Sequence, residues 1–327
     1  MEHINDRPVG RFAPSPTGRM HLGNVFSALL SWLSAKSRGG SWLLRIEDID
    51  TGRSRRDYAL QLMDDLQWLG LAWDGEPLWQ SQRSHVYEHY FSLLQQQGCI
   101  YPCYCTRADL LAAQAPHESD GRVVYPGTCR PRTLAIPGAA VPAASASVPV
   151  PTAAVPGASA SVPSRPAAMR LMVPDEVVSF TDGHYGQQQV NLARQVGDFI
   201  VRRKDGGWAY QLAVVVDDAL SGVTEVVRGR DLLLSSPQQM YVARLLGFPP
   251  QHFIHFPLLV NSDGQRLSKR DRSLDMACLR EQYTARDIIG LLAHLAGLTP
   301  QPQPASPTDL LPLFQWDKVP MSDIVVE

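Results

Sequence analysis

The N-terminal third of the chain alternates short apolar runs with longer stretches in which apolar residues recur at helical spacing. The short runs occupy residues 9–13 and 42–46, and the periodic stretches occupy 22–37 and 59–69. Short runs of this kind predict buried strands, and a period near 3.6 predicts helices with one apolar face. The order strand, helix, strand, helix with short connections predicts a parallel α/β sheet covered on both faces.

The remainder of the chain carries further predicted elements. We expect helices at 86–97, 237–246 and 275–298, and strands at 214–218, 223–228 and 255–260. Asp205-Gly206 lies between two apolar runs and predicts a β-hairpin. Ser54 followed by Asp57 is typical of a helix N-cap and predicts that a helix starts there.

Residues 131–166 fit neither pattern. They consist almost entirely of Ala, Pro, Ser and Val, and Ala-Ser-Ala-Ser-Val-Pro occurs at both 144–149 and 158–163. A stretch of such low complexity cannot bury enough apolar surface to offset the entropy lost on ordering. We therefore predict a disordered surface loop and assign it no function.

Composition narrows the class of protein. The chain has 327 residues, 44% of them apolar, which suffices for a sizeable core. The formal net charge is −2, so an RNA partner would have to use a local basic surface. The N-terminus lacks a secretory signal pattern, and no apolar run reaches the roughly 18 residues of a membrane span. We expect a cytosolic monomer without a membrane segment.

One segment near the N-terminus predicts an anion site. Pro14, Pro16 and Gly18 follow the first predicted strand, and His21 and Gly23 open the first predicted helix. A tight turn between a strand and a helix directs backbone N–H groups at an anion. A histidine donor and a glycine that permits close approach of a nucleotide suit the α-phosphate of ATP. The alternative is an ordinary turn in which His21 merely caps the helix.

The segment 266–270, Arg-Leu-Ser-Lys-Arg, contains one of only four lysines in the chain. Lys269 would neutralise the departing pyrophosphate, Ser268 would donate to phosphate, and the Asp263-Gly264 turn would let the loop hinge. The alternative is a solvated basic loop. Taken together with His21, the segment predicts a site that activates an acid at the ATP α-phosphate, with His21 and Lys269 as catalytic residues.

Three of the five cysteines, Cys103, Cys105 and Cys129, are close together in the sequence beside Pro/Gly turns. Thiolates at this spacing suit a structural Zn²⁺ site. The fourth ligand would be Tyr125 or His117, and spacing alone favours His117 because histidine is the commoner ligand. The alternative is a group of free, buried cysteines. An odd cysteine count argues against a disulfide framework and for a reducing compartment. We expect the other two cysteines in the core.

Several polar residues lie at or near the ends of predicted strands, where open α/β sheets bind ligands. They are Arg11, Ser15, Glu47, Tyr210 and Arg228. A substrate with two carboxylates and one ammonium would require two arginines and one glutamate. Asp217 and Asp218 are similarly placed, but a helix cap or an internal salt link explains them equally well.

Six motifs resemble those of the class I glutamyl-tRNA synthetases. They are R-F-A-P-S-P-T-G at 11–18, H-L-G-N at 21–24, L-L-R-I-E-D-I-D at 43–50, A-Y-Q-L-A-V-V-V-D-D at 209–218, V-R-G-R-D-L at 227–232 and R-L-S-K-R at 266–270. The second and the last are variants of the family's HIGH and KMSKS motifs. Asn24 replaces the last His of HIGH, and Arg270 replaces the last Ser of KMSKS. The first His, the Gly and the Ser-Lys pair are kept.

The resemblance implies a doubly wound, Rossmann-like catalytic domain with an inserted zinc-binding, acceptor-type subdomain and a short helical C-terminal region. Residues 1–98 and 191–260 would form the two halves of the catalytic domain. Residues 99–190 would form the insertion, and 261–327 the KMSKS-like loop and the C-terminal region.

The resemblance also implies roles for single residues. ATP, with Mg²⁺, would be bound by Pro14, Thr17, Gly18, His21, Gly23, Asn24, Ser268 and Lys269. L-Glutamate would be bound by Arg11, Phe12, Ala13, Pro14, Ser15, Glu47, Tyr210 and Arg228. Glu47 would meet the ammonium and the arginines the carboxylates. The family's zinc site uses Tyr, so the resemblance favours Tyr125 over His117.

Length distinguishes between branches of the family. Only 57 residues follow Arg270, too few for the anticodon-binding domain of a full-length glutamyl-tRNA synthetase. The resemblance therefore implies a truncated branch that transfers glutamate to queuosine in the anticodon loop of tRNA(Asp). Three alternatives remain open here: a minimal 3′-end glutamyl-tRNA synthetase, a zinc-containing RNA-binding module with an inactive nucleotide site, and another nucleotidyltransferase with this sheet.

Overall fold

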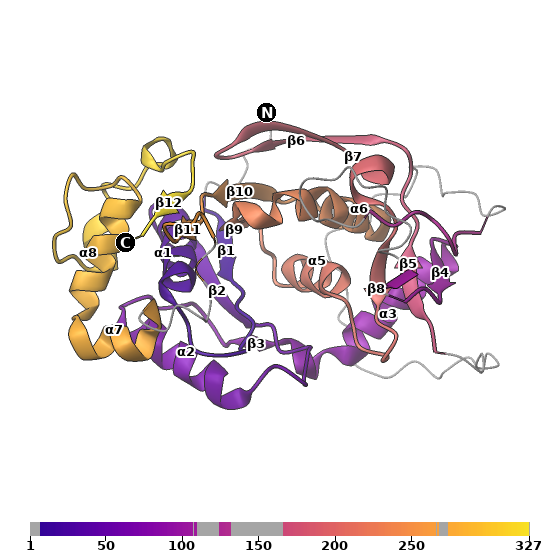
Figure 1. The fold of residues 1–327 in the computed structure, drawn as a ribbon, viewed down its shortest axis with the longest axis horizontal. Coiled ribbons are helices and arrows are strands. Elements are labelled where there is room, and N and C mark those ends of the chain that lie inside the picture. The colour runs from indigo at the N-terminus through magenta and orange to yellow at the C-terminus, as the bar shows by residue number, and fades with distance from the viewer. Residues whose placement is uncertain are drawn as a thin grey trace.

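The computed structural model describes residues 7–106, 108–109, 124–131, 166–265, 267 and 274–326 (Figure 1). The first elements are β1 (Val9–Phe12), α1 (Leu22–Lys36), β2 (Ser41–Ile46), α2 (Arg56–Trp68) and β3 (Leu78–Trp79). β2 pairs in parallel with β1 on one side and with β3 on the other. The parallel α/β arrangement predicted from the sequence is confirmed.

Two later strands continue this layer. β9 (Glu225–Gly229) and β10 (His252–Phe256) pair in parallel. The N–H of Thr224, just before β9, donates to the carbonyl of Val9 at 3.0 Å. β1 and β9 therefore start side by side, and residues at the far ends of both strands line one cavity. Open parallel sheets bind ligands at this edge.

Successive side chains of these strands point to opposite faces of the sheet. The members that pack with α1 in the main core are Phe12, Leu44, Val227 and Phe256. Their neighbours on the opposite face are Arg11, Arg45, Arg228 and His255, all buried. One face of the sheet thus supplies the apolar core, and the other gathers three buried guanidinium groups and one imidazole.

The other half of the molecule has its own sheet and core (Figure 1). β4 (Ile100–Cys103), β5 (Ala168–Leu171) and β8 (Phe199–Arg202) form an antiparallel sheet, and β6 (Val177–Asp182) and β7 (Gly186–Asn191) form a hairpin. The helices of this half are α3 (Ser84–Gln96), α5 (Tyr210–Leu220) and α6 (Ser236–Leu246). β8 lies after residue 190, in the predicted second half of the catalytic domain, but it pairs with β5 of the predicted insertion. The division into domains at 98, 190 and 260 stays a prediction.

The C-terminal elements lie against the first half. They are β11 (Leu259–Val260), α7 (Met276–Gln282), α8 (Ala285–Leu295), α9 (Pro307–Leu310) and β12 (Ile324–Val325). Short helical turns occur at Gln80–Gln82, Leu192–Val196, Arg230–Ser235 and Trp316–Lys318. Ile288 and Leu292 of α8 join the core that contains α1. Within the described ranges, every helix is too short or too polar to cross a bilayer.

The strand predicted at 214–218 is wrong, because these residues belong to α5. Residues Leu212 to Asp218 of this helix are all buried. A helix buried on every side shows no 3.6-residue period, and its run of valines therefore resembles a buried strand. Of the two explanations offered for Asp217 and Asp218, the internal salt link is confirmed and the helix cap is not needed. Asp217 accepts from Gln80, Arg83 and Tyr87, each at 2.7 Å.

Three local predictions also need correction. The helix cap assigned to Ser54 is wrong, since α2 begins at Arg56 and its N-cap, Arg55, makes no side-chain cap. The turn at Asp205-Gly206 is present, but its second arm pairs only through the Arg202–Trp208 bridge before α5 begins. The single strand predicted at 255–260 is instead two strands, β10 and β11, which pair with different partners.

Candidate active site

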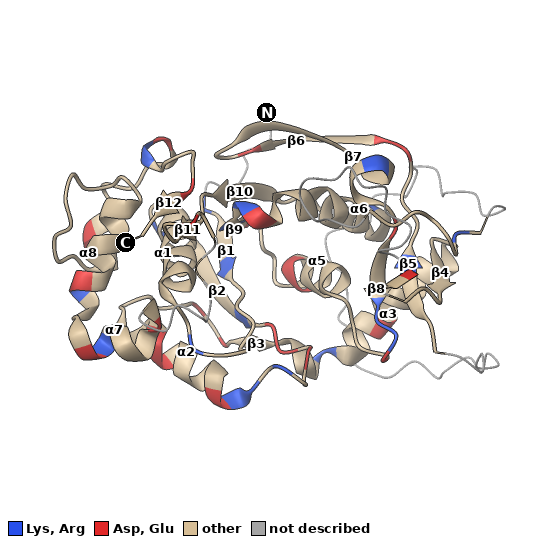
Figure 2. Ribbon diagram, viewed as in Figure 1, with Lys and Arg blue, Asp and Glu red and all other residues tan. Residues whose placement is uncertain are grey.

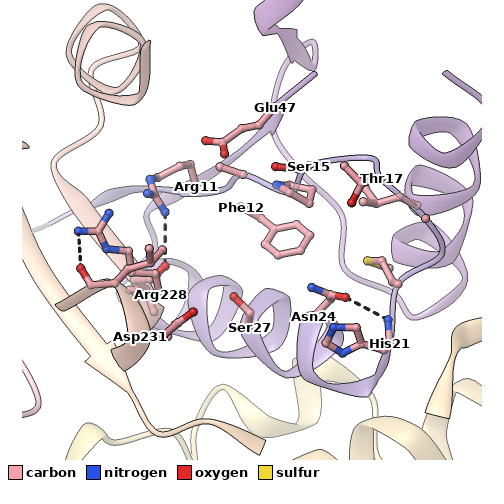
Figure 3. A pocket seen from close by; sticks show the side chains of 18 of the residues that line it. Arg11, Phe12, Ser15, Thr17, His21, Asn24, Ser27, Glu47, Arg228 and Asp231 are labelled. Atoms are coloured by element: carbon pink, nitrogen blue, oxygen red, sulfur yellow. Dashed lines mark hydrogen bonds between the residues drawn. The ribbon is translucent and has the colours of Figure 1, made fainter. Parts of the chain in front are cut away.

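A cavity of about 450 Å³ opens at the carboxyl ends of β1 and β9 (Figure 3). The predicted site residues that line it are Arg11, Phe12, Ala13, Pro14, Ser15, Thr17, Gly18, His21, Asn24, Glu47, Tyr210 and Arg228. Gly23 lines a smaller adjoining cavity instead. Ser268 and Lys269 lie outside the described residues. The structure thus brings both predicted ligand sets, apart from these two residues, to one place, and their roles stay predictions.

His21 is the N-cap residue of α1 and lies at the N-terminus of this helix. Its Nδ1 accepts a hydrogen bond from the N–H of Gly23 at 3.2 Å, and the Oδ1 of Asn24 accepts from the N–H of His21 at 3.1 Å. Because Nδ1 accepts, the neutral imidazole carries its proton on Nε2, which makes that nitrogen a donor. Nδ1 therefore caps the helix, while the Nε2–H is able to donate a hydrogen bond to a phosphate, so one imidazole can serve both purposes.

Two departures from expectation have a structural reason at this helix start. Asn24, where HIGH has His, completes the capping box that fixes His21. A Cβ on Gly23 would lie 3.1 Å from Nδ1 and Cε1 of His21. The absence of a side chain at 23 therefore makes room for the imidazole, whereas the sequence suggested room for the nucleotide.

The residues that flank segment 268–273 lie beside His21. Leu267 is buried, its N–H donates to Leu259 at 3.1 Å, and it lines the adjoining cavity of about 60 Å³ together with His21. On the other side of the segment, Asp275 forms an antiparallel bridge with His21, and the N–H of Met276 donates to Met20 at 2.9 Å. The chain therefore leaves and re-enters the described structure next to the predicted phosphate site.

The opposite end of the cavity rests on a buried charge network. Arg11 lies 3.3 Å from Asp218, Arg45 bonds the same carboxylate, and Arg45 also donates to Glu47 at 3.1 Å. Burial raises the pKa of Asp218, but Arg45 and Arg11 outweigh it and hold that pKa below its usual value. Burial raises the pKa of Glu47, with Arg45 opposing. Asp218 is therefore an anion that fixes two guanidinium groups under the cavity.

Arg228 is held by groups of α6 and β10, and Asp182 of β6 supports one of them. Its guanidinium donates to Gln239 and to Ser236, both at 2.8 Å, and its Nε donates to the Nε2 of His255 at 3.1 Å. The Nδ1 of His255 in turn donates to Asp182 at 2.6 Å. Burial lowers the pKa of His255 despite this carboxylate, so the ring is neutral at pH 7 and accepts from Arg228.

Charge at this end suits a dicarboxylic amino acid. Arg11 and Arg228 approach the cavity from β1 and β9, and Glu47 faces them from the end of β2 (Figure 3). Two positive groups and one negative group complement two carboxylates and one ammonium. Tyr210, at the start of α5, lines the same wall, and burial raises the pKa of its hydroxyl.

A second cluster of candidate ligands lies in the other half of the molecule. The sulfurs of Cys103, Cys105 and Cys129 are all within 4.8 Å of one another. The Tyr125 hydroxyl lies 3.5 Å from the sulfur of Cys103 and 4.0 Å from that of Cys105. Burial raises the pKa of Cys103, but hydrogen bonds from Tyr125 and Arg170 lower it to about 7. His117 lies outside the described residues.

The remaining two cysteines were both expected in the core, and the structure separates them. Cys99 is fully buried, as predicted. Cys278 is only partly buried on α7, so its assignment to the core is wrong.

Residues 9–132 and 157–302 match the family described as tRNA synthetases class I (E and Q), catalytic domain. The chain belongs to this class I synthetase family. It is 43% identical over 326 residues to the "Glutamyl-Q tRNA(Asp) synthetase" of Nitratidesulfovibrio vulgaris, covering 97% of this chain and 94% of the relative. It is 44% identical over 327 residues to the protein of that name from Symbiobacterium thermophilum, covering 96% and 94%.

Solved structures of class I synthetases resemble the fold. A glutamate tRNA ligase from Elizabethkingia meningosepticum, solved in complex with its amino acid, superposes with a TM-score of 0.75 at 26% identity, covering 98% of this chain and 67% of that one. A glutamate-tRNA synthetase from Elizabethkingia anophelis gives 0.76 at 26% identity, covering 98% and 68%.

Several residues of this class I synthetase site escaped the sequence analysis. Arg45 stands inside the motif at 43–50 and two positions before Glu47, so the alternation of a strand would have placed it on the same face. The residues that hold Arg228 are Asp182, Ser236, Gln239 and His255. They come from β6, α6 and β10, and no sequence pattern joins them.

Proposed function

We propose that this protein activates L-glutamate with ATP and transfers the glutamyl group to queuosine in the anticodon loop of tRNA(Asp). The observation that carries the proposal is one cavity with Arg11, Arg228 and Glu47 at one end and His21 at the start of α1 at the other. The names of the relatives agree with this chemistry and supply the acceptor.

Glutamate would be held with its carboxylates at Arg11 and Arg228 and its ammonium at Glu47. In the activation step a carboxylate oxygen attacks the α-phosphorus of ATP, and the bond to the β-phosphate oxygen breaks to release pyrophosphate. The Nε2–H of His21 and the first N–H groups of α1 stabilise the charge that grows on the phosphate. Each such donor is worth about 3–4 kcal/mol of the barrier.

Pro14, Thr17, Gly18, Gly23 and Asn24 would complete the nucleotide site. Lys269 and Ser268 would bind the departing pyrophosphate, because the residues flanking their segment lie beside His21. Mg²⁺, carried by ATP, would neutralise phosphate charge.

In the transfer step a queuosine hydroxyl attacks the acyl carbon of glutamyl-adenylate. The new ester C–O bond forms, the C–O bond to AMP breaks, and the hydroxyl proton is released. The buried network of Arg11, Arg45 and Asp218 would keep the amino-acid end of the cavity rigid while the acceptor approaches.

We also propose that Cys103, Cys105, Tyr125 and Cys129 hold a structural Zn²⁺. A tetrahedral ion with Zn–S bonds of about 2.3 Å separates two sulfurs by roughly 3.8 Å. The sulfurs of Cys105 and Cys129 lie 3.6 Å apart, and the Tyr125 hydroxyl is within 4.0 Å of two sulfurs, so the donor set fits. An odd number of cysteines, three of them in this cluster, favours a reducing compartment, and the cytosol remains the expected location.

Glutamate-dependent exchange of pyrophosphate into ATP tests the activation step. We expect exchange with glutamate and none with aspartate or glutamine. If glutamate also gave no exchange, the protein would be a binding module with an inactive nucleotide site. Transfer of labelled glutamate should then occur on tRNA(Asp) that contains queuosine. Labelling of tRNA(Glu), or of tRNA(Asp) without queuosine, would instead support a 3′-end synthetase.

Metal content tests the zinc site separately. Cys105→Ser should lower bound zinc from one ion per chain to none and lower the melting temperature, because a structural ion contributes folding free energy. Cys278→Ser is the matched control and should keep one ion. Equal zinc content in the two variants would reject the site.

A further inference from the structure

A second cavity lies on the far side of the loop that lines the active site. It measures about 240 Å³ and is bounded by Pro16, Arg55, Arg56 and Trp79. The neighbours of Pro16, Ser15 and Thr17, line the active-site cavity. The N–H of Arg55 donates to the Pro16 carbonyl at 2.9 Å and fixes the start of α2 against this loop. One residue of chain therefore separates the two cavities.

The wall formed by Arg56 and Trp79 combines a positive charge with an aromatic ring. The guanidinium carbon of Arg56 lies 5.1 Å from the centroid of the Trp79 ring. Among the described residues, Arg56 has no carboxylate within ion-pair distance, so its charge is available to a ligand. Stacked arginine and aromatic side chains of this kind bind unpaired nucleobases.

A second arginine stands at the rim. Arg55 lies 3.6 Å from Asp57, but both side chains are mostly exposed, at 66% and 73%, so the pair contributes little. Asp48 is the acid among the lining residues, and its oxygens accept from the N–H and hydroxyl of Ser81 at 2.8 and 2.6 Å. The lining therefore carries two arginines against one carboxylate that is already hydrogen-bonded.

The second cavity is adjacent to the active site, because neighbouring residues of the chain line the two cavities. Asp48 directly follows Glu47, which faces the active site. The chain as a whole has a net charge of −2, so an RNA substrate must find positive charge locally. Figure 2 shows basic residues where α2 begins.

We propose that this cavity binds a nucleotide of the RNA substrate next to the one that receives glutamate. The base stacks on Trp79 and Arg56, and Arg55 meets a backbone phosphate. The inference rests on the proposed function, because it assumes an RNA acceptor. ATP is excluded as the occupant in this scheme, since its phosphates are assigned to His21 on the other side of the loop.

The test compares RNA-dependent and RNA-independent activities of the same variants. Trp79→Ala and Arg56→Ala should raise the KM for queuosine-containing tRNA(Asp) in the transfer assay by roughly 5- to 150-fold, the range found when a stacking partner of a base is removed. Trp79→Phe keeps a stacking face and should stay within about threefold of the parent. All three should keep glutamate-dependent pyrophosphate exchange within about twofold, because that reaction needs no RNA.

One control variant and one binding measurement complete the test. Arg194→Ala removes an exposed arginine elsewhere and should leave the KM for tRNA unchanged. Direct titration of tRNA binding against salt should give Arg55→Ala, which loses the phosphate contact, a slope smaller by about one counterion than Trp79→Ala. Unchanged KM and tRNA affinity in both Arg56→Ala and Trp79→Ala, with exchange intact, would overturn the RNA site. Loss of exchange in the parent protein would overturn the proposed function instead.

Discussion

The two ends of the active-site cavity are built in different ways. The phosphate end comes from one continuous segment, Pro14 to Asn24, whose turn and helix start place His21 by local hydrogen bonds. The carboxylate end joins β1, β2 and α5 through buried ion pairs. Arg228 of β9 is fixed by hydrogen bonds to α6 and β10, and Asp182 of β6 supports His255 from behind. In the proposed function, charge on ATP would thus be met by local geometry, whereas selection of the amino acid would depend on contacts made across the whole fold.

This difference predicts that the carboxylate end is coupled to stability. In Asp218→Asn the buried guanidinium groups of Arg11 and Arg45 lose their counter-charge. The free energy of unfolding should fall by about 3–5 kcal/mol, measured by denaturant at pH 7. Asp175→Asn removes an exposed, ion-paired carboxylate and should change it by no more than about 0.5 kcal/mol. Equal effects of the two substitutions would contradict the coupling.

The pH dependence of Asp218→Asn sharpens this prediction. The folded pKa of Asp218 lies below its unfolded value of about 3.9, so its stabilisation is present above that pH and is lost as the pH falls through the folded pKa. The difference in the free energy of unfolding between parent and variant should therefore be smaller at about pH 3 than at pH 7. A difference independent of pH would show that the carboxylate is not ionised in the folded protein.

At the phosphate end, the expected effects are on rate and not on stability. Lys269→Ala should slow glutamate-dependent pyrophosphate exchange by about 10²–10³-fold, with the melting temperature unchanged. Lys204→Ala, another of the four lysines and exposed, is the matched control and should exchange at the parent rate. A parent-like rate for Lys269→Ala removes this lysine from the mechanism.

His21→Asn separates the two uses of the imidazole. Asparagine is a strong N-cap, so stability should change by only a few tenths of a kcal/mol. The variant lacks the distal donor, and exchange should fall by about 10²-fold. If exchange stayed within threefold of the parent, His21 would be a capping residue alone.

The smallest expected effect concerns the support of Arg228. His255→Leu removes the acceptor for the Nε–H of Arg228, and the KM for glutamate should rise roughly tenfold, as expected for one hydrogen bond to a charged group. The KM for ATP should not change. His255→Gln restores an acceptor at a similar distance and should recover most of the affinity. Equal KM values for the leucine and glutamine variants would indicate a packing role only.

The same difference explains what the sequence could predict. The segment 14–24 and its residues were predictable because strand, turn and helix start are adjacent in the chain. The cysteine cluster was predictable from spacing. The partners of Arg228 were not, because packing in three dimensions brings them together. α5 was taken for a strand because it is buried on all sides, and Tyr210 therefore lies at a helix start and not near a strand end.

Locating labelled glutamate on tRNA(Asp) after nuclease digestion tests both the activation of glutamate in this cavity and its transfer to a base of the anticodon loop. We expect the label on the anticodon-loop fragment that contains queuosine. Label on the 3′-terminal adenosine would contradict it.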